Sequence, residues 1–134
     1  MKILKRVAIV ILAYLAIVVV FESLIGYFQP VNPSTLVLTT SDGDGETRDR
    51  VLARLESGDQ LYVAANHWPR AWYRRALENP TVVVDLGADG KRAHQAIPVV
   101  GAEHDRVDQD NSLGIGFRIL TGFPPRYFLR LEPI

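Results

Sequence analysis

The sequence contains no cysteine, and its charge is balanced, with 15 lysine and arginine residues against 15 aspartate and glutamate residues. The lack of cysteine excludes disulfide bonds, thiol nucleophiles and cysteine metal ligands. A net charge of zero argues against general affinity for nucleic acid, because such proteins normally carry a basic surplus that displaces counterions from the phosphates. We therefore expect no nucleic-acid partner.

Motifs for metal binding and for hydrolysis are also missing. The histidines His67, His94 and His104 lie far apart, without the ligand spacing of a zinc site. No G-x-S-x-G nucleophile elbow is present. The "GIG" of residues 114–116 lacks the third glycine of a dinucleotide-binding turn. We therefore expect neither a bound metal nor serine-hydrolase chemistry.

Apolar residues make up 48% of the chain, and many of them are gathered near the N-terminus. Residues 7–21 carry no charge, and Glu22 is the only charged residue from there to Phe28. At about 1.5 Å per residue, a helix over residues 7–28 would measure about 33 Å, enough to cross a hydrocarbon core of about 30 Å. We predict a transmembrane anchor over residues 1–28, which contacts the lipid bilayer through residues 7–28.

The basic residues before this run, Lys2, Lys5 and Arg6, allow two interpretations. They resemble the charged region of a signal peptide, but no small-residue cleavage pattern follows the apolar run, which favours an uncleaved anchor. No further basic residue occurs before Arg48, and basic flanks stay in the cytoplasm. We predict a single-pass protein of the cytoplasmic (inner) membrane, with its N-terminus inside and its soluble domain outside.

After a linker over residues 29–34, short β-branched runs alternate with glycine and aspartate turn signals. Strands are expected at residues 35–40, 49–56, 61–65, 81–86, 91–100, 117–120 and 127–132. Short strands joined by tight turns indicate an antiparallel sheet that closes on itself. Residues 35–134 are therefore expected to form one mainly β domain, a small barrel with one or two helices.

The stretch "AANHWPRAWYRRALENP", residues 64–80, predicts the one strong helix within this β pattern. Pro69 suits a first helical turn, and Asn79 before a proline marks the end. Trp72 and Leu77 are expected to pack the helix onto the barrel.

The first part of that stretch, "NHWPR" at residues 66–70, lies where a strand passes into a helix. Free backbone N–H groups and the helix dipole attract anions at such a junction. Asn66 and His67 can donate hydrogen bonds, Trp68 offers a stacking face, and the planar fork of Arg70 suits phosphate. The alternative is a helix start that Asn66 merely caps.

The order of these motifs is more informative than any one of them. A strand "LVLTT", a glycine turn with an arginine after it, a strand "LYVAAN" and then "PRAWYRRALENPTVVVD" follow one another. This order resembles the deazaflavin-dependent nitroreductase and quinone reductase family over about residues 35–106. The resemblance implies a split β-barrel, as in flavin reductases, that holds a deazaflavin with its phosphate-bearing tail in a basic groove. FMN is the alternative cofactor.

The resemblance also implies which positions bind the cofactor, although it identifies no catalytic side chain. Arg48 and Arg70 would bind phosphate, and the junction of residues 66–68 would contact the cofactor. The full implied set is Thr39, Thr40, Arg48, Asn66, His67, Trp68, Arg70, Trp72 and Tyr73.

Two functions follow from this reading. The first is a membrane-anchored oxidoreductase, an enzyme that passes a hydride from a reduced deazaflavin or flavin to a quinone or nitro compound. The second is a non-catalytic binding module of the cell envelope, on a split β-barrel that has lost its cofactor groove. The second is open because His67 and Trp68 stand where the family has a glycine pair, and bulky residues prevent close backbone approach.

Overall fold

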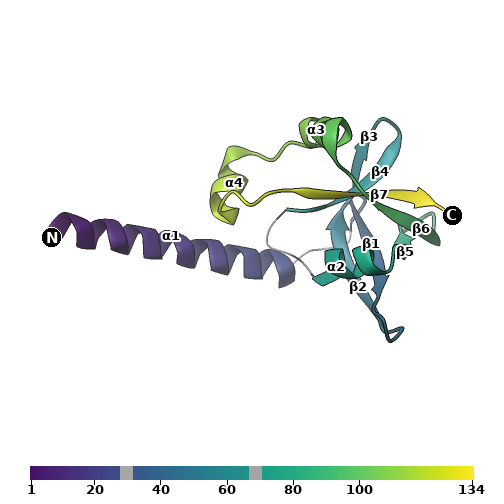
Figure 1. Ribbon diagram of the computed structural model, residues 1–134, viewed down its shortest axis with the longest axis horizontal. Helices are drawn as coiled ribbons and strands as arrows, with labels where there is room; N and C mark the ends of the chain where they lie inside the picture. The colour runs from purple at the N-terminus through teal and green to yellow at the C-terminus, as the bar shows by residue number, and fades with distance from the viewer. Residues whose placement is uncertain (28–31, 67–70) are drawn as a thin grey trace. The chain divides into compact units, whose positions relative to one another are not determined.

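The computed structural model describes residues 1–27, 32–66 and 71–134. The chain divides into two units (Figure 1). One unit contains Met1–Gln29 together with Leu113–Pro124, and the other contains Pro30–Ser112 together with Pro125–Ile134. The first unit thus combines the predicted anchor with a segment from late in the chain.

The first unit is built from two helices, α1 (Lys2–Tyr27) and α4 (Ile115–Thr121). Lys2–Leu24 is long and apolar enough to cross a membrane, and it is the one such helix among the described residues. None of its apolar window is buried. By length and composition, α1 therefore agrees with the predicted anchor.

The prediction of a strand at residues 117–120 is wrong, because these residues belong to α4. A four-residue apolar run has no periodicity that distinguishes a strand from a helix. The helix is fixed by its surroundings. Phe117 meets Phe21 of α1 edge to face, with ring centroids 5.9 Å apart, and Gly122 ends the helix in a left-handed conformation with φ of 79°.

The second unit is a curled antiparallel sheet of seven strands, which confirms the predicted split barrel (Figure 1). Their order is β2-β1-β5-β6-β7-β4-β3, and β2 also contacts β4, so the sheet bends round on itself. The strands are β1 (Thr35–Ser41), β2 (Thr47–Ala53), β3 (Leu55–Ser57), β4 (Gln60–Ala65), β5 (Thr81–Asp85), β6 (Lys91–Pro98) and β7 (Tyr127–Pro133).

The tight turn between β3 and β4 has the geometry that its residues favour. Ser57 pairs with Gln60, and only Gly58 and Asp59 lie between them. Their φ angles are 55° and 62°. Two positive φ values in a two-residue loop match the type I′ turn, which follows the twist of the strands.

Helices contribute to the burial of both faces of β4 and β7. Successive strand residues point to opposite faces, and both Tyr62 and Val63 of β4 are fully buried. On the Val63 face, α2 (Ala71–Glu78) inserts Trp72 and Ala76 into the larger core. Leu77, expected to pack there, is exposed instead, because the inward positions of α2 are one turn apart at 72 and 76.

The opposite face is covered by α3 (Gly101–Asp110). Its Val107 packs with Tyr62, Val99 and Phe128 in a second core cluster. Strands β4 and β7 are therefore buried on both faces, which explains why their sequences are almost continuously apolar.

Candidate functional site

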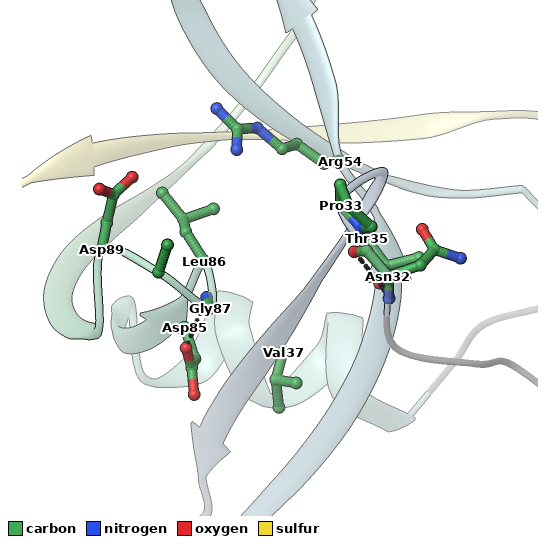
Figure 2. Close-up of a pocket in the computed structure, with 10 residues that line it drawn as sticks. Asn32, Pro33, Thr35, Val37, Arg54, Asp85, Leu86, Gly87 and Asp89 are labelled. Carbon is green, nitrogen blue, oxygen red and sulfur yellow. Dashed lines mark hydrogen bonds between the residues drawn. The ribbon is translucent and has the colours of Figure 1, made fainter.

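The hollow beside the start of β1 and the turn after β5 has a volume of about 400 Å³ (Figure 2). Asp85, Asp89 and Arg54 line it. Arg54 is already paired with Glu56, at 2.9 Å, so two carboxylates would repel an anionic ligand. None of the predicted cofactor positions that the structure describes lines this hollow. It is therefore a poor place for a phosphate-bearing cofactor.

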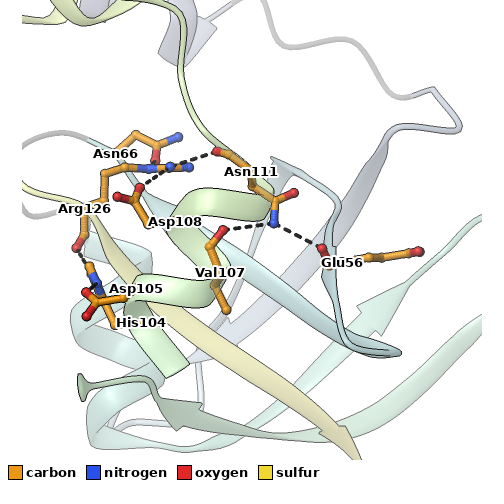
Figure 3. A network of polar contacts seen from close by, with 8 residues as sticks. All are labelled: Glu56, Asn66, His104, Asp105, Val107, Asp108, Asn111 and Arg126. Carbon is orange, nitrogen blue, oxygen red and sulfur yellow. Dashed lines mark hydrogen bonds and ion pairs between the residues drawn. The ribbon is translucent and has the colours of Figure 1, made fainter. Parts of the chain in front are cut away.

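A network around Arg126 defines the end of β4 (Figure 3). The side chain of Arg126 is only 8% exposed. Its Nε donates to Oδ1 of Asn66 at 2.9 Å, and its Nη1 donates to Oδ1 of Asp108 at 2.6 Å and to the carbonyl of Asn111 at 2.8 Å. Because Oδ1 of Asn66 faces Arg126, the amide N–H₂ group of Asn66 is turned away from it (Figure 3).

The described histidines hold backbone groups. His104 Nε2 bonds the carbonyl of Arg126 at 2.9 Å, and Nδ1 of His94 lies 3.0 Å from the carbonyl of Arg92. Within the described ranges, no group of three potential ligands could hold a metal ion. These two histidines therefore have a structural role, as partners of backbone carbonyl groups.

An aromatic pair lies next to the Arg126 network. Tyr127 follows Arg126 and stands opposite Ala65, the residue before Asn66. Its ring lies 5.7 Å from that of Tyr73 on α2, at 34°. Tyr127 is 50% exposed. Burial first, and then the neighbouring Tyr127, raise the pKa of Tyr73, which favours the neutral form of the Tyr73 ring.

The helix α2 and the residue after it are joined to β1 by an arginine and an asparagine. Nε of Arg75 donates to Oγ1 of the fully buried Thr40 at 3.0 Å, and Nδ2 of Asn79 donates to the carbonyl of Ser41 at 3.1 Å. Arg48 stands opposite Thr40 in the β1–β2 ladder. Its side chain is 64% exposed and lies 3.8 Å from Glu46. Arg75 thus bonds Thr40 near the end of β1, and Arg48 stands at the position opposite Thr40.

The turn between β1 and β2 does not offer a phosphate its backbone. Oδ1 of Asp42 accepts the N–H groups of Asp44 and Glu46, at 2.9 and 3.0 Å. Converging backbone N–H groups are what an anion-binding turn uses. Here a carboxylate of the chain accepts both N–H groups, so they are not available to a phosphate.

Several predicted positions lie on α2 or on the strands that it contacts. Tyr73 lies towards Asn66 and β7, whereas the buried Thr40 and exposed Arg48 lie at the end of β1. Thr39 faces away from Thr40 and donates to Oδ1 of Asp49 at 2.6 Å.

The remaining predicted positions either belong to the core or lie outside the described residues. Trp72 is 3% exposed and belongs to the core. His67, Trp68 and Arg70 lie outside the described residues.

Sequence reasoning missed Arg75, Arg126 and Tyr127. The last two stand in "GFPPRYF", residues 122–128, whose aromatic and cationic content was a signal that it lines or seals the barrel. The bond between Arg126 and Asn66 carried no such signal, because 60 positions separate the two residues.

Comparison with solved structures supports the same fold. A chain described as a domain-swapped dimer is 17% identical, with a TM-score of 0.62, and the match covers 78% of this chain and 84% of that one. An F420-H2 dependent reductase is 19% identical, with a TM-score of 0.57 and coverage of 76% and 98%. The heme storage protein HutZ from Vibrio cholerae is 18% identical, with a TM-score of 0.57 and coverage of 77% and 83%. At these identities the likeness shows the fold alone.

The curled sheet and its helices define the chain as a split-barrel protein of the flavin-reductase type. A comparison with curated protein sequences finds no match. The family model of the F420H(2)-dependent quinone reductases matches residues 15–113, and the chain belongs to this family. Membership favours an oxidoreductase over the non-catalytic module.

Proposed function

We propose that the protein is a membrane-anchored reductase that passes a hydride from reduced F420, a deazaflavin, to a quinone or a nitro compound. The observations that carry the proposal are two groups of side chains at α2: the ring of Tyr73 beside that of Tyr127, and Arg75 bonded to Thr40, which stands opposite Arg48. Aromatic rings suit a planar ring system, and arginines suit a phosphate-bearing tail. Family membership supports the same cofactor.

Each of the two groups has a separate task. Tyr73 and Tyr127 bind the face of the planar ring, and the amide of Asn66, held by Arg126, orients its polar edge. Arg75 and Arg48 bind phosphate beside Thr40. Contacts from Thr39, His67, Trp68, Arg70 and Trp72 stay predictions of the family resemblance.

The chain contributes position and electrostatics to this reaction. When bound, the reduced deazaflavin supplies a hydride, and a quinone that takes up the hydride and a proton from solvent becomes a hydroquinone. The half-buried aromatic pair excludes water from one side of the reacting ring, and Arg126 fixes Asn66 in one orientation. FMN is the alternative cofactor, and no metal is required.

The anchor part of the proposal rests on α1 and its flanks. Lys2–Leu24 has the length and composition of a span, and Lys2, Lys5 and Arg6 favour an N-terminus in the cytoplasm. The protein would then cross the cytoplasmic membrane once, with the sheet domain outside. A bilayer anchor places the reductase beside lipid-soluble quinones.

A titration tests the cofactor directly. The detergent-solubilised full chain is titrated with oxidised F420 and, separately, with FMN, and binding is followed by the absorbance and fluorescence of the ligand. We expect saturable binding of F420. Lack of binding of either ligand at high micromolar concentration would overturn the proposal. Turnover is then measured by mixing F420H2 with a quinone or a nitroaromatic compound.

The chain offers a matched pair of variants for the same titration. Arg75→Gln removes the guanidinium beside Thr40, whereas Arg74→Gln removes its exposed neighbour on α2. Only Arg75→Gln should weaken F420 binding. Equal effects of the two variants would show that the phosphate lies elsewhere.

Orientation has its own test. A reporter fused to the C-terminus, active on only one side of the membrane, should report the outside. Activity in the cytoplasm would overturn the orientation and leave the hydride transfer standing.

A further inference from the structure

The outward face of α4 is apolar, although it follows the polar helix α3. Phe117 and Thr121 lie one turn apart, and the ring of Phe117 contacts α1. The opposite side carries exposed apolar side chains, with Ile115 68% and Phe123 57% exposed. We call this set the α4 apolar face; it consists of Ile115, Ile119, Leu120 and Phe123.

Three contacts hold α4 against the second half of α1. Besides the ring contact of Phe117 with Phe21, the hydroxyl of Tyr14 donates to the carbonyl of Ile119 at 2.7 Å. Gly122 lies so close to α1 that a Cβ there would stand 3.3 Å from Val18. The two helices therefore form one unit with a defined alignment.

Several backbone groups at the end of α4 are bonded within the unit. The N–H groups of Gly122 and Phe123 return to the carbonyls of Ile119 and Arg118. The hydroxyl of Thr121 donates to the carbonyl of Phe117 at 2.9 Å, and Tyr14 adds its bond to Ile119. Closure of this kind is what hydrocarbon demands, since lipid offers no partner to an open backbone group.

The surfaces of α1 and α4 are continuous in their chemistry. A shallow hollow of about 350 Å³ lies between them, lined by apolar side chains alone. Five of its residues come from α1, including Val20 and Leu24, and Leu120 comes from α4. A hollow of this chemistry fits a lipid acyl chain and offers nothing to a polar partner.

One cation stands within this apolar surface. Arg118 is half-buried, and within the residues that the structure describes its guanidinium has no hydrogen-bond or ion-pair partner. Its neighbours Phe117 and Ile119 meet Phe21 and Tyr14, which lie about 5 and about 15 Å from Leu24 along α1. Arg118 thus lies within one leaflet of a bilayer that α1 crosses, and an arginine there turns its head towards the phosphates.

We propose that Leu113–Pro124 is a second membrane-inserted element, in which the α4 apolar face contacts acyl chains and Arg118 binds an anionic lipid phosphate. It occupies the leaflet on the side of the C-terminal half of α1. This inference rests on the proposed anchor, and it adds a lipid contact that a single-pass anchor does not have.

Spin labels test the insertion, because the chain has no cysteine and single cysteines can be placed at will. The full chain carrying Ile115→Cys or Ile119→Cys is labelled and reconstituted in phosphatidylcholine vesicles with phosphatidylglycerol. Oxygen concentrates in the bilayer and a nickel chelate stays in water. We expect both labels to collide often with oxygen and seldom with the nickel chelate, because labels inside the bilayer are exposed to oxygen and shielded from water.

Two reference labels separate the possible failures. Leu12→Cys, on the exposed apolar side of α1, reports the anchor, and Asp89→Cys, in an exposed turn of the sheet unit, reports water. If Leu12→Cys is in the membrane and the α4 labels are in water, the insertion is overturned and the anchor stands. If Leu12→Cys is also in water, the anchor itself fails. Spin–spin broadening between α4 labels would instead show that a second copy of the chain covers this face, and it would overturn the lipid contact.

The phosphate contact has a separate readout. Spin-labelled phosphatidylglycerol and phosphatidylcholine are compared for the fraction held at the protein. One arginine near an anionic surface contributes enough to change this preference by about fivefold. Arg118→Gln should lower the preference for phosphatidylglycerol by about that factor, and Arg74→Gln should leave it unchanged. An unchanged preference in Arg118→Gln would overturn the role of Arg118.

Discussion

Arg126 donates a hydrogen bond of 2.9 Å to Asn66, across 60 positions of the sequence. The bond joins the residue before β7 to the residue after β4, where the strand passes towards α2. The same guanidinium lies 4.7 Å from the ring centroid of Phe128 and pairs with Asp108. One side chain therefore joins the start of β7, the helix α3 and the proposed ligand-orienting amide after β4.

Removal of this guanidinium should destabilise the sheet unit. In Arg126→Gln the carboxylate of Asp108 loses its partner, and the loss of a buried, charged network costs about 2–3 kcal/mol, since Asp108 is partly hydrated. Urea denaturation of the solubilised chain, followed by tryptophan fluorescence, measures the free energy of unfolding. Arg74→Gln, an exposed change on α2, is the control and should have no effect. Equal stability of Arg126→Gln and wild type would show that water replaces the network without cost.

The bonds between α3 and the sheet should make stability depend on acid pH. The hydroxyl of the buried Tyr62 donates to Oε1 of Glu103 at 2.8 Å, and Arg130 bonds the same oxygen. The hydrogen bond from Arg130 holds the pKa of Glu103 below its ordinary value of 4.5, although burial opposes it. A lowered pKa means that the carboxylate stabilises the folded state fully above about pH 4.5, and that this contribution is lost as the pH falls through the folded-state pKa.

Glu103→Gln tests this dependence. Between pH 7 and about 4.5, the wild type should exceed the variant in the free energy of unfolding by a constant margin. The margin should close as the pH falls further, because protonation does to the wild type what the substitution does to the variant. Urea denaturation over this pH range measures it, with the exposed Glu78→Gln as control. A margin that persists at the lowest pH would assign the effect to shape instead of charge.

The β3–β4 turn should be sensitive to one methyl group. Gly58 has a φ of 55° and nothing within 4 Å of the position of a Cβ, so Gly58→Ala meets no clash but pays the backbone cost of a left-handed residue, about 1–2 kcal/mol. Gly43 has equal space and no positive φ. Gly43→Ala should therefore have little effect or stabilise slightly. Thermal unfolding of the two variants compares them, and equal melting temperatures would contradict the assigned turn.

Local patterns account for what the sequence predicted correctly. Alternation and turn residues act within a few positions, so most strands and the turn at Gly58 followed from the sequence alone. The single strand expected at residues 49–56 is instead divided into β2 and β3. The helix at residues 115–121 did not, because Phe21 and Tyr14, which fix it, lie about a hundred positions earlier. Leu77 was misplaced by one helical position, which a face estimated from spacing alone does not resolve.

In the candidate site, too, local motifs were predicted from the sequence and contacts between distant segments were not. The family motif supplied Tyr73 and Asn66, which lie on or beside α2. It did not supply Tyr127 or Arg126, because their roles arise from strand pairing between β4 and β7. The sequence showed that the turn around Asp42 is acidic. Only the structure shows that the Asp42 carboxylate accepts backbone N–H groups of that turn.

The exposed ring of Tyr127 should matter for binding and little for folding. Tyr127 is 50% exposed and lies beside Tyr73, so its loss removes about half of the proposed aromatic surface while it leaves the core intact. An aromatic contact contributes about 1 kcal/mol, and Tyr127→Ala should therefore raise the Kd for F420 by about fivefold. Tyr127→Phe keeps the ring and should bind as the wild type does. If both variants weaken binding equally, the hydroxyl and not the ring contacts the ligand. If neither does, the planar ring is bound elsewhere, and the proposed site loses its aromatic group.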